Sequence, residues 1–207
     1  MSRLIVYYAH PGQRYSRANS AMAKVAQQIE GISIVDLYAE YPRHGVNVDR
    51  EQQRLLDHDV ILFQFPLYWY STPSLVKEWQ DLVLEHGFAY GSGGTRLAGK
   101  TMMLALTAAG PVEAYTHEGY QHYPLRTFLT PLEQTARLCK MHFPAPYVLH
   151  SSLQAEEGGE IADHAKGYGQ LLEAIRDDRY DFAAPGADGI VTFETLPISA
   201  ATTEASA

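Results

Sequence analysis

Polar and basic side chains follow the first apolar run of the chain. Leu4–Tyr8 has the character of a buried strand, and His10 lies in the loop after it. A helix predicted to begin near Ser16, with Asn19 in its first turn, would leave its first backbone N–H groups without partners, which favours a phosphate site. The same neighbourhood holds two basic side chains, Arg14 and Arg17. The alternative is that Ser16 is an ordinary helix cap and His10 an ordinary loop residue.

A run of large aromatic side chains is the second candidate for chemistry. Residues 60–63 form an unbroken apolar run typical of a strand buried on both faces. The chain then breaks at Pro66 into a predicted loop that holds Leu67, Tyr68, Trp69 and Tyr70. A helix is predicted next, with Thr72 as its N-cap and Pro73 at its first position. Aromatic residues at the carboxyl end of a central strand are placed for ligand binding, and equally for a core or a subunit interface.

Other patterns resemble functional motifs but fail on spacing. The glycines of residues 91–94 have Arg96 where a dinucleotide fingerprint needs its third glycine, and they precede a strand, so an exposed turn is predicted. His117 and His122 are five positions apart and would not share one helix face, so no metal site is predicted. The single Cys139 lies in an apolar helical stripe and is predicted to be core.

The composition is that of one acidic globular domain. The chain has 207 residues, with 16 basic and 24 acidic side chains and a net charge of -8, which argues against nucleic acid as a partner. No apolar run is long enough for a transmembrane helix, and no secretory signal is evident. A single cysteine suits a reducing compartment, so a cytoplasmic location is expected.

Strand-like and helix-like stretches alternate along the chain, which predicts an α/β fold with a doubly wound parallel sheet. The predicted strands cover residues 4–8, 34–37, 60–63, 100–107 and 146–150. The predicted helices cover residues 16–31, a short stretch capped by Asp49, and residues 73–83, 131–141 and 161–175, with irregular connections at 38–47 and 108–124. Residues 1–184 are predicted to form the domain, and residues 185–207 a flexible tail rich in Ala, Thr and Ser.

Several blocks of sequence, in the same order, resemble the flavodoxin-like NAD(P)H:quinone oxidoreductases. They are YAHPGQRYSRAN, DLYAEYP, FQFPLYWYSTPSLVKEW, GFAYGSGGTRLAGK and LCKMHF, which begin at residues 8, 36, 63, 87 and 138. The branch that is most similar consists of the ancillary subunits of glutathione-gated (Kef type) potassium efflux systems. The resemblance implies a three-layer flavodoxin-like sandwich with five parallel strands in the order 2-1-3-4-5.

The resemblance also implies a flavin site. In the family, the residues at His10, Ser16 and Asn19 hold the flavin phosphate. The segment that wraps the ribityl chain and the ring edge corresponds to Pro66, Leu67, Tyr68, Trp69 and Tyr70. A Thr-Thr-Gly-Gly loop that touches the flavin ring corresponds to Thr107, Ala108, Ala109 and Gly110, and two of these four residues depart from the family pattern.

The resemblance further implies two catalytic side chains over the flavin ring. A family tyrosine that helps to stabilise charge during hydride transfer corresponds to Tyr115. A family histidine follows it, and both His122 and His117 are candidates, with His122 taken as the expectation.

The implied chemistry is hydride transfer from NAD(P)H through a bound flavin to a quinone, with the two substrates occupying one face in turn. FMN is the expected cofactor and FAD the alternative. A homodimer is expected to complete the site, with Trp69 and Tyr70 contributing. The alternative function is a regulatory subunit at the inner face of the cell membrane, which docks on a potassium/proton antiporter and keeps flavin mainly for structure. A one-electron carrier is the weakest interpretation, because it does not need a substrate-sized aromatic pocket.

Overall fold

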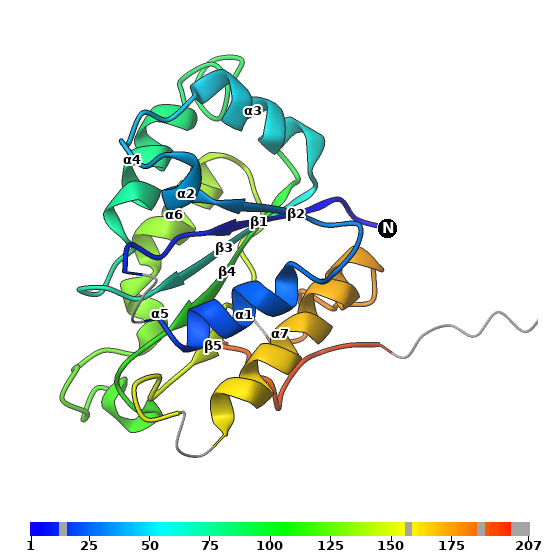
Figure 1. Ribbon diagram of the computed structural model, residues 1–207. Coiled ribbons are helices and arrows are strands. Elements are labelled where there is room, and N and C mark those ends of the chain that lie inside the picture. The colour runs from blue at the N-terminus through cyan, green and yellow to red at the C-terminus, as the bar shows by residue number, and fades with distance from the viewer. Residues whose placement is uncertain (13–15, 156–158, 186–188, 200–207) are drawn as a thin grey trace, which may run out of the picture.

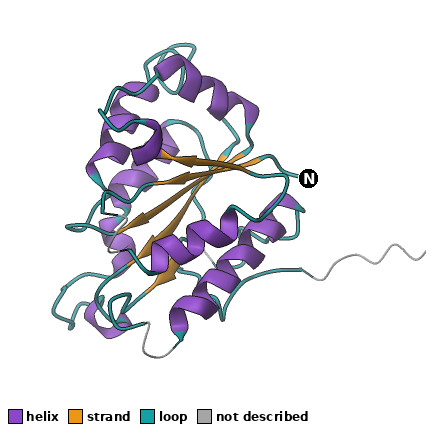
Figure 2. Ribbon diagram, in the orientation of Figure 1, coloured by secondary structure: helices purple, strands orange, loops and turns teal. Residues whose placement is uncertain are grey.

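The computed structural model describes residues 1–12, 16–155, 159–185 and 189–199, so Arg14 lies outside the described residues. Its centre is a five-stranded parallel sheet in the order β2-β1-β3-β4-β5. Helices cover both faces of this sheet (Figures 1 and 2). The prediction of a flavodoxin-like three-layer sandwich is therefore confirmed.

The strands coincide closely with the apolar runs of the sequence. They are β1 (Leu4–Tyr8), β2 (Ser33–Asp36), β3 (Val60–Pro66), β4 (Thr101–Thr107) and β5 (Tyr147–Leu149). Every residue of β1, β3, β4 and β5 is buried, as expected of parallel strands that are covered on both faces. The register aligns Tyr8 with Gln64, and Pro66 with Thr107, so these strands end near one another at one edge of the sheet.

The helices form two layers, each with its own apolar core. They are α1 (Ala18–Ala26), α2 (Leu37–Glu40), α3 (Val48–Asp57), α4 (Ser74–Val83), α5 (Leu125–Phe128), α6 (Thr130–Leu138) and α7 (Glu160–Arg176). A short 3₁₀ turn also forms at Val112–Ala114. Helices α1 and α7 pack together on one face of the sheet (Figure 1), where Met22 and Tyr168 are fully buried. Helices α2 to α6 contribute to the core on the other face.

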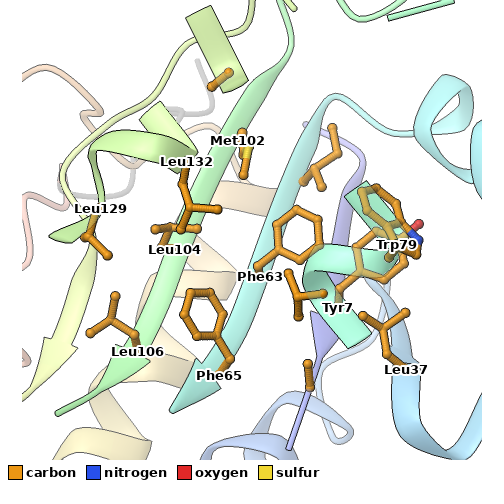
Figure 3. Close-up of a cluster of buried hydrophobic side chains, with 14 of the residues drawn as sticks. Tyr7, Leu37, Phe63, Phe65, Trp79, Met102, Leu104, Leu106, Leu129 and Leu132 are labelled. Atoms are coloured by element: carbon orange, nitrogen blue, oxygen red, sulfur yellow. The ribbon is translucent and has the colours of Figure 1, made fainter. Parts of the chain in front are cut away.

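An aromatic cluster anchors the larger core. The rings of Tyr7 and Phe63 stack with centroids 5.3 Å apart, and both contact Trp79 (Figure 3). The Trp79 indole N–H donates to the carboxylate of Glu51 at 3.1 Å, and Arg54 pairs with the same buried carboxylate at 2.5 Å. These bonds offset the cost of burying a charged group between α3 and α4.

Helix starts are where the structure differs from the sequence predictions. Helix α1 begins at Ala18 rather than near Ser16, and α4 begins at Ser74 with Pro73 as its N-cap in place of Thr72. Asn47 caps α3 through a bond from the Arg50 N–H, in place of Asp49. These shifts are one or two residues, because several neighbouring residues can satisfy the first N–H groups of a helix.

The connection predicted to be irregular at residues 38–47 begins with helix instead. Helix α2 forms because the carboxylate of Asp36 accepts hydrogen bonds from the N–H groups of Tyr38 and Ala39, each at 3.1 Å. Such a cap compensates for the short length of the helix.

The C-terminal segment at residues 189–199 packs on the domain, which differs from the expected tail. Val191 is fully buried, and its N–H donates to the carbonyl of Pro146 at 2.8 Å beside β5. Ile198 pairs with Tyr180 after α7. Strand β5 is at the edge of the sheet, where its outer backbone groups would otherwise be unpaired. Val191 forms hydrogen bonds with some of these groups.

Among the described residues, none of the helices is both long and apolar enough to cross a membrane. Within the same ranges, no group of three or more His, Cys, Asp or Glu residues is placed to hold a metal ion.

Candidate functional site

The loops that follow β1, β3, β4 and β5 surround one cleft at the carboxyl edge of the sheet. Its volume is about 440 Å³, within the range of small-molecule sites. Among the residues predicted from the sequence, the cleft is lined by His10, Ser16, Asn19, Pro66, Leu67, Tyr68, Thr107 and Ala109. These residues come from three separate segments of the chain, and Ser152 and Leu153 after β5 add a fourth, at the edge where open α/β sheets bind their ligands.

Ser16 gives the cleft an unsatisfied hydroxyl group. Its Oγ is buried and makes no hydrogen bond within the described residues. It precedes α1, whose N-cap residue Arg17 makes no side-chain cap bond and whose first turn has no acidic residue. The helix start therefore presents N–H groups, a buried hydroxyl and the positive end of the helix dipole to the cleft. This combination of donors suits a phosphate group.

His10 is a second donor on the same wall. Its side chain is buried, and its Nδ1 accepts a hydrogen bond from the N–H of Gly12 at 3.1 Å. In the neutral ring this bond leaves the proton on Nε2, which lies 3.5 Å from the hydroxyl of Tyr68. Burial lowers the pKa of His10 below its ordinary value, so the ring is neutral near pH 7 and donates through Nε2.

A buried polar network fixes the start of α1 against the sheet. The side-chain amide of Asn19 donates to the hydroxyl of Thr107 at 2.8 Å. The amide of Gln64, fully buried in β3, donates to the backbone carbonyl of Asn19 at 2.8 Å. These bonds join α1, β3 and β4, so the position of Ser16 is coupled to the ends of both strands.

The aromatic segment after β3 forms a tight turn at the mouth of the cleft. The backbones of Tyr68 and Ser71 exchange hydrogen bonds at 3.0 Å. Between them, Trp69 and Tyr70 have φ values of 48° and 64°, the left-handed pattern of a type I′ turn. Side chains other than glycine adopt this conformation at a cost, and such strain gathers at functional sites.

The turn presents its aromatic rings in different directions. Tyr68 lines the cleft, whereas Trp69 is 92% exposed and does not line it. The ring of Tyr70 stacks on Phe128 with centroids 4.9 Å apart, and Tyr123 also contacts Phe128. We name Trp69, Tyr70, Tyr123 and Phe128 the aromatic patch.

The loop after β4 is bonded through its backbone to the loop after β5. The N–H of Ala108 donates to the Leu149 carbonyl at 2.8 Å, and the Ala108 carbonyl accepts from Ser152 at 3.0 Å. Ala109 lines the cleft. A Cβ atom on Gly110 would lie 2.9 Å from the hydroxyl of Tyr120 and 3.1 Å from a ring carbon of Tyr115, so any other residue there would have to displace these side chains.

Tyr115 and the predicted histidines lie apart from one another. Tyr115 is buried beside Gly110, and burial raises the pKa of its hydroxyl. His117 and His122 are exposed, and the backbone N–H of His122 donates a hydrogen bond to the carbonyl of Gly119. The histidine in ring contact with Tyr115 is His150, after β5, with centroids 5.5 Å apart.

Several cleft residues were not singled out from the sequence. They are Ala18, Ser152 and Leu153. Ser152 and Leu153 follow β5, and the only available signal was that the carboxyl ends of parallel strands meet at one edge. The loop after β5 carries no motif of its own, so its contribution depends on the three-dimensional arrangement.

These residues fit a flavin mononucleotide. The buried hydroxyl of Ser16 lacks a partner, the start of α1 offers N–H groups, and His10 directs a donor into the same cleft. The opposite wall, formed by Pro66, Leu67 and Tyr68, is apolar and aromatic, as a flat heterocyclic ring requires.

The fold of this protein agrees with what comparison with known proteins finds. A family model described as a flavodoxin-like fold matches residues 1–172. The chain belongs to this flavodoxin-like family. It is 42% identical over 171 residues to the glutathione-regulated potassium-efflux system ancillary protein KefG of Enterobacter sp. (strain 638), which covers 83% of this chain and 93% of the relative.

Solved structures that are similar to this chain include proteins named for FMN binding and for quinone reduction. A general stress protein 14 of Treponema denticola in complex with FMN is 32% identical, with a TM-score of 0.77, and the match covers 84% of this chain and 99% of that one. An NADPH-quinone reductase of P. pentosaceus is 25% identical, with a TM-score of 0.71, over 81% of this chain and 96% of that one.

Proposed function

We propose that the protein is a flavin-dependent NAD(P)H:quinone oxidoreductase with FMN as its cofactor. The observation that carries the proposal is the cleft at the carboxyl edge of the sheet. It combines the unpartnered Ser16 hydroxyl at a helix start with an aromatic wall at Tyr68. FAD is the alternative cofactor. The relatives named for FMN and for quinone reduction support the same class of chemistry.

The residues at the start of α1 hold the phosphate end of the cofactor. Ser16 and the first N–H groups of α1 donate to phosphate oxygens, and His10 adds a donor from the other side. The Asn19–Thr107 bond keeps these donors fixed relative to the sheet. Because the donors are arranged in advance, binding requires little reordering of the protein.

The flavin, when bound, supplies the hydride chemistry. Pro66, Leu67 and Tyr68 pack beside its ribityl chain and ring edge and exclude water from that side. Ala109 lines the cleft from the loop after β4, and Gly110 follows it in the same loop. NAD(P)H and the quinone bind in turn at the remaining open face, which gives ping-pong kinetics.

Tyr115 acts at the reacting end of the site. Its hydroxyl keeps its proton at neutral pH because burial raises its pKa. It donates to the negative charge that develops on the acceptor oxygen. A preorganised donor of this kind contributes about 10²–10³ in rate.

The second candidate function is a regulatory subunit of a glutathione-gated potassium efflux antiporter. The identity of 42% with a potassium-efflux ancillary protein favours it. The alanines at positions 108 and 109, where the loop departs from the pattern that touches the flavin ring, also favour it, and the exposed Trp69 is a side chain that docking could cover. Such a protein would work in the cytoplasm, as a homodimer at the inner face of the membrane. Both functions are compatible in one protein.

Steady-state quinone reduction by NADH and NADPH tests the proposal, with Tyr115→Phe as the diagnostic variant. The substitution keeps the ring and removes the hydroxyl, so turnover should fall about 10²–10³-fold with the flavin content unchanged. Tyr90→Phe, at a tyrosine outside both the cleft and the aromatic patch, controls for the loss of a tyrosine hydroxyl elsewhere in the protein. Undiminished turnover in Tyr115→Phe would remove Tyr115 from the chemistry. Absence of quinone reduction by the unaltered protein would favour the regulatory function.

A further inference from the structure

Phe128, the last residue of α5, contacts aromatic rings from two different loops. The ring of Tyr70, in the turn after β3, stacks on it at an angle of 30° with centroids 4.9 Å apart. The rings of Tyr115 and Tyr123, from the loop after β4, meet it at 81°, with centroids 6.2 and 6.1 Å away. Stacked and edge-to-face arrangements are the ones that aromatic pairs favour. The Phe128 ring is therefore a shared support for side chains that are far apart in the sequence.

The chain around Phe128 is anchored in the apolar core. Leu125 and Leu129, on either side of it, are 4% and 0% exposed. Figure 3 shows Leu129 in the buried cluster with Leu104 and Leu106 of β4. The side chain of Phe128 is half-buried and packs against the same core. The ring is thus mounted on a closely packed part of the fold, whereas the residues that it contacts lie on connecting loops.

The loop that carries Tyr115 is shaped by hydrogen bonds within itself. The N–H of Tyr115 donates to the carbonyl of Val112 at 3.0 Å, and the N–H of Gln121 donates to the carbonyl of Ala114 at 3.1 Å. These bonds do not link the loop to the turn after β3. The ring contacts of Phe128 provide that link.

Tyr115 and Tyr70 are close enough to influence each other electrostatically. Burial is the main cause of the raised pKa of the Tyr115 hydroxyl, and Tyr120 and Tyr70 raise it further. Tyr70 also lies two residues after Tyr68, which lines the cleft. Phe128 thus supports two neighbouring tyrosines on the side of the cleft that the proposed function assigns to the reacting end of the flavin.

We propose that Phe128 is a positioning residue, whose ring holds the Tyr115 hydroxyl in the place where it meets the electron acceptor. The inference rests on the proposed function. Phe128 donates no proton itself, since its ring has no titratable group, and its effect is geometric. Displacement of a reacting group by about 1 Å can lower a rate about 10²-fold. Ser16 and His10, which hold the phosphate end of the flavin, belong to other elements, so flavin affinity should not depend on Phe128.

The kinetic test compares Phe128→Ala and Phe128→Tyr with the unaltered protein, each loaded with FMN and assayed with a water-soluble benzoquinone. Alanine removes the support, so the turnover number should fall about 10- to 100-fold with little change in KM. Tyrosine keeps the ring and should retain nearly all of the turnover. The dissociation constant of FMN should be the same in all three proteins.

Phe182→Ala is the matched control for loss of a half-buried phenyl ring. Phe182 is also in ring contact with a tyrosine, Tyr180, with centroids 5.0 Å apart, but it packs against the core on the other face of the sheet. Its variant should lose stability in a similar way and keep the turnover of the unaltered protein. Each variant is assayed well below its melting temperature, so that a loss of stability alone does not lower the rate.

A double-mutant cycle tests whether Phe128 acts through Tyr115. In the Tyr115→Phe background, Phe128→Ala should lower turnover far less than it does in the unaltered protein, because the hydroxyl that it positions is already absent. An equal loss in both backgrounds would show that Phe128 acts independently of Tyr115, and would overturn the inference.

A second readout does not depend on activity. Amide hydrogen exchange in the flavin-free protein follows the N–H groups of Tyr115 and Gln121, which are bonded within the loop. Their exchange should be at least about tenfold faster in Phe128→Ala, because the loop loses its support, and unchanged in Phe182→Ala. Unchanged exchange in Phe128→Ala would contradict a role for this ring in holding the loop.

The outcomes separate this inference from the proposed function. Active protein in which Phe128→Ala keeps its turnover overturns the role of Phe128 alone, and so does a loss of turnover that loss of FMN explains. Light scattering gives the oligomeric state of each variant, and a loss that follows from dissociation of subunits also overturns it. Unaltered protein that reduces no quinone overturns the proposed function, and the positioning role of Phe128 with it.

Discussion

At the scale of single residues, Ser16 is the clearest sign of a bound anion. Its buried hydroxyl has no partner among the described residues, and it does not cap α1. Ser16→Ala should therefore weaken FMN binding about ten- to a hundredfold, because one hydrogen bond to a charged group is lost. The dissociation constant is measured by quenching of flavin fluorescence.

The melting temperature of the flavin-free protein serves as the control for Ser16→Ala. It should change little, since the hydroxyl stabilises no helix start in the ligand-free chain. A lower melting temperature with unchanged affinity would mean that Ser16 is a structural cap.

The sequence was sufficient to identify Ser16, His10 and Asn19 as neighbours, because all three follow one strand and lie within a short stretch of chain. It was not sufficient to identify His150 as a neighbour of Tyr115. The contact between His150 and Tyr115 joins the ends of different strands, and neither residue belongs to a shared motif. Such pairs depend on how the loops after β4 and β5 bond to each other.

At the scale of elements, α7 contains a histidine that makes the fold sensitive to acid. His164 is fully buried and stacks on Tyr147, with ring centroids 4.3 Å apart. Burial lowers its pKa to about 3, whereas the unfolded chain has the ordinary value of about 6.5. The folded state therefore requires the neutral ring.

The sign of the pH dependence follows from this difference. Above about pH 6.5 the His164 ring is neutral in both states, and its contribution to stability is fully present. As pH falls from about 6.5 toward 3, His164 binds a proton in the unfolded chain but stays neutral in the folded protein. The free energy of unfolding should then fall by about 1.4 kcal/mol per pH unit through this group.

His164→Phe keeps the stacking on Tyr147. It should remove the contribution of His164, about 1.4 kcal/mol per pH unit, from the pH dependence of the free energy of unfolding. Urea unfolding between pH 4 and 6, a range of about two units below the ordinary histidine pKa, measures the effect. His142→Phe, at an exposed histidine, is the matched control. Equal slopes in the unaltered protein and in His164→Phe would show that His164 is protonated in the folded state.

The strands were predicted well because long, uninterrupted apolar runs have few alternatives to a buried parallel strand. Helix starts were predicted less well, since Thr72, Pro73 and Ser74 are all residue types that occur at the start of a helix. The C-terminal segment could not be predicted at all. Val191 is buried through its pairing with Tyr147 at the edge of the sheet, and no periodicity marks such an isolated contact.

At the scale of the whole molecule, the aromatic patch is the expected site of a two-fold dimer. Trp69 is 92% exposed in the single chain and lies beside the cleft mouth on a strained turn. A soluble protein rarely leaves such aromatic groups uncovered. The unaltered protein should scatter light as a dimer at micromolar concentration, and Trp69→Arg should scatter as a monomer with the same helix content.

Leu138→Arg tests whether a new charge at any exposed apolar residue is enough to dissociate the dimer. Leu138 is 55% exposed at the end of α6, outside the aromatic patch, so its variant should remain a dimer. A fully active monomer of the unaltered protein would contradict the expected dimer.

We propose above all that the cleft holds a flavin which takes electrons from NAD(P)H. The absorbance spectrum of purified protein reconstituted with FMN, recorded before and after anaerobic addition of NADPH or NADH, tests it most directly. We expect one FMN per chain, and loss of the oxidised-flavin absorbance when the nicotinamide is added. A quinone added next should restore that absorbance. Protein that retains no FMN or FAD, or that binds flavin which neither nicotinamide reduces, would rule out this function.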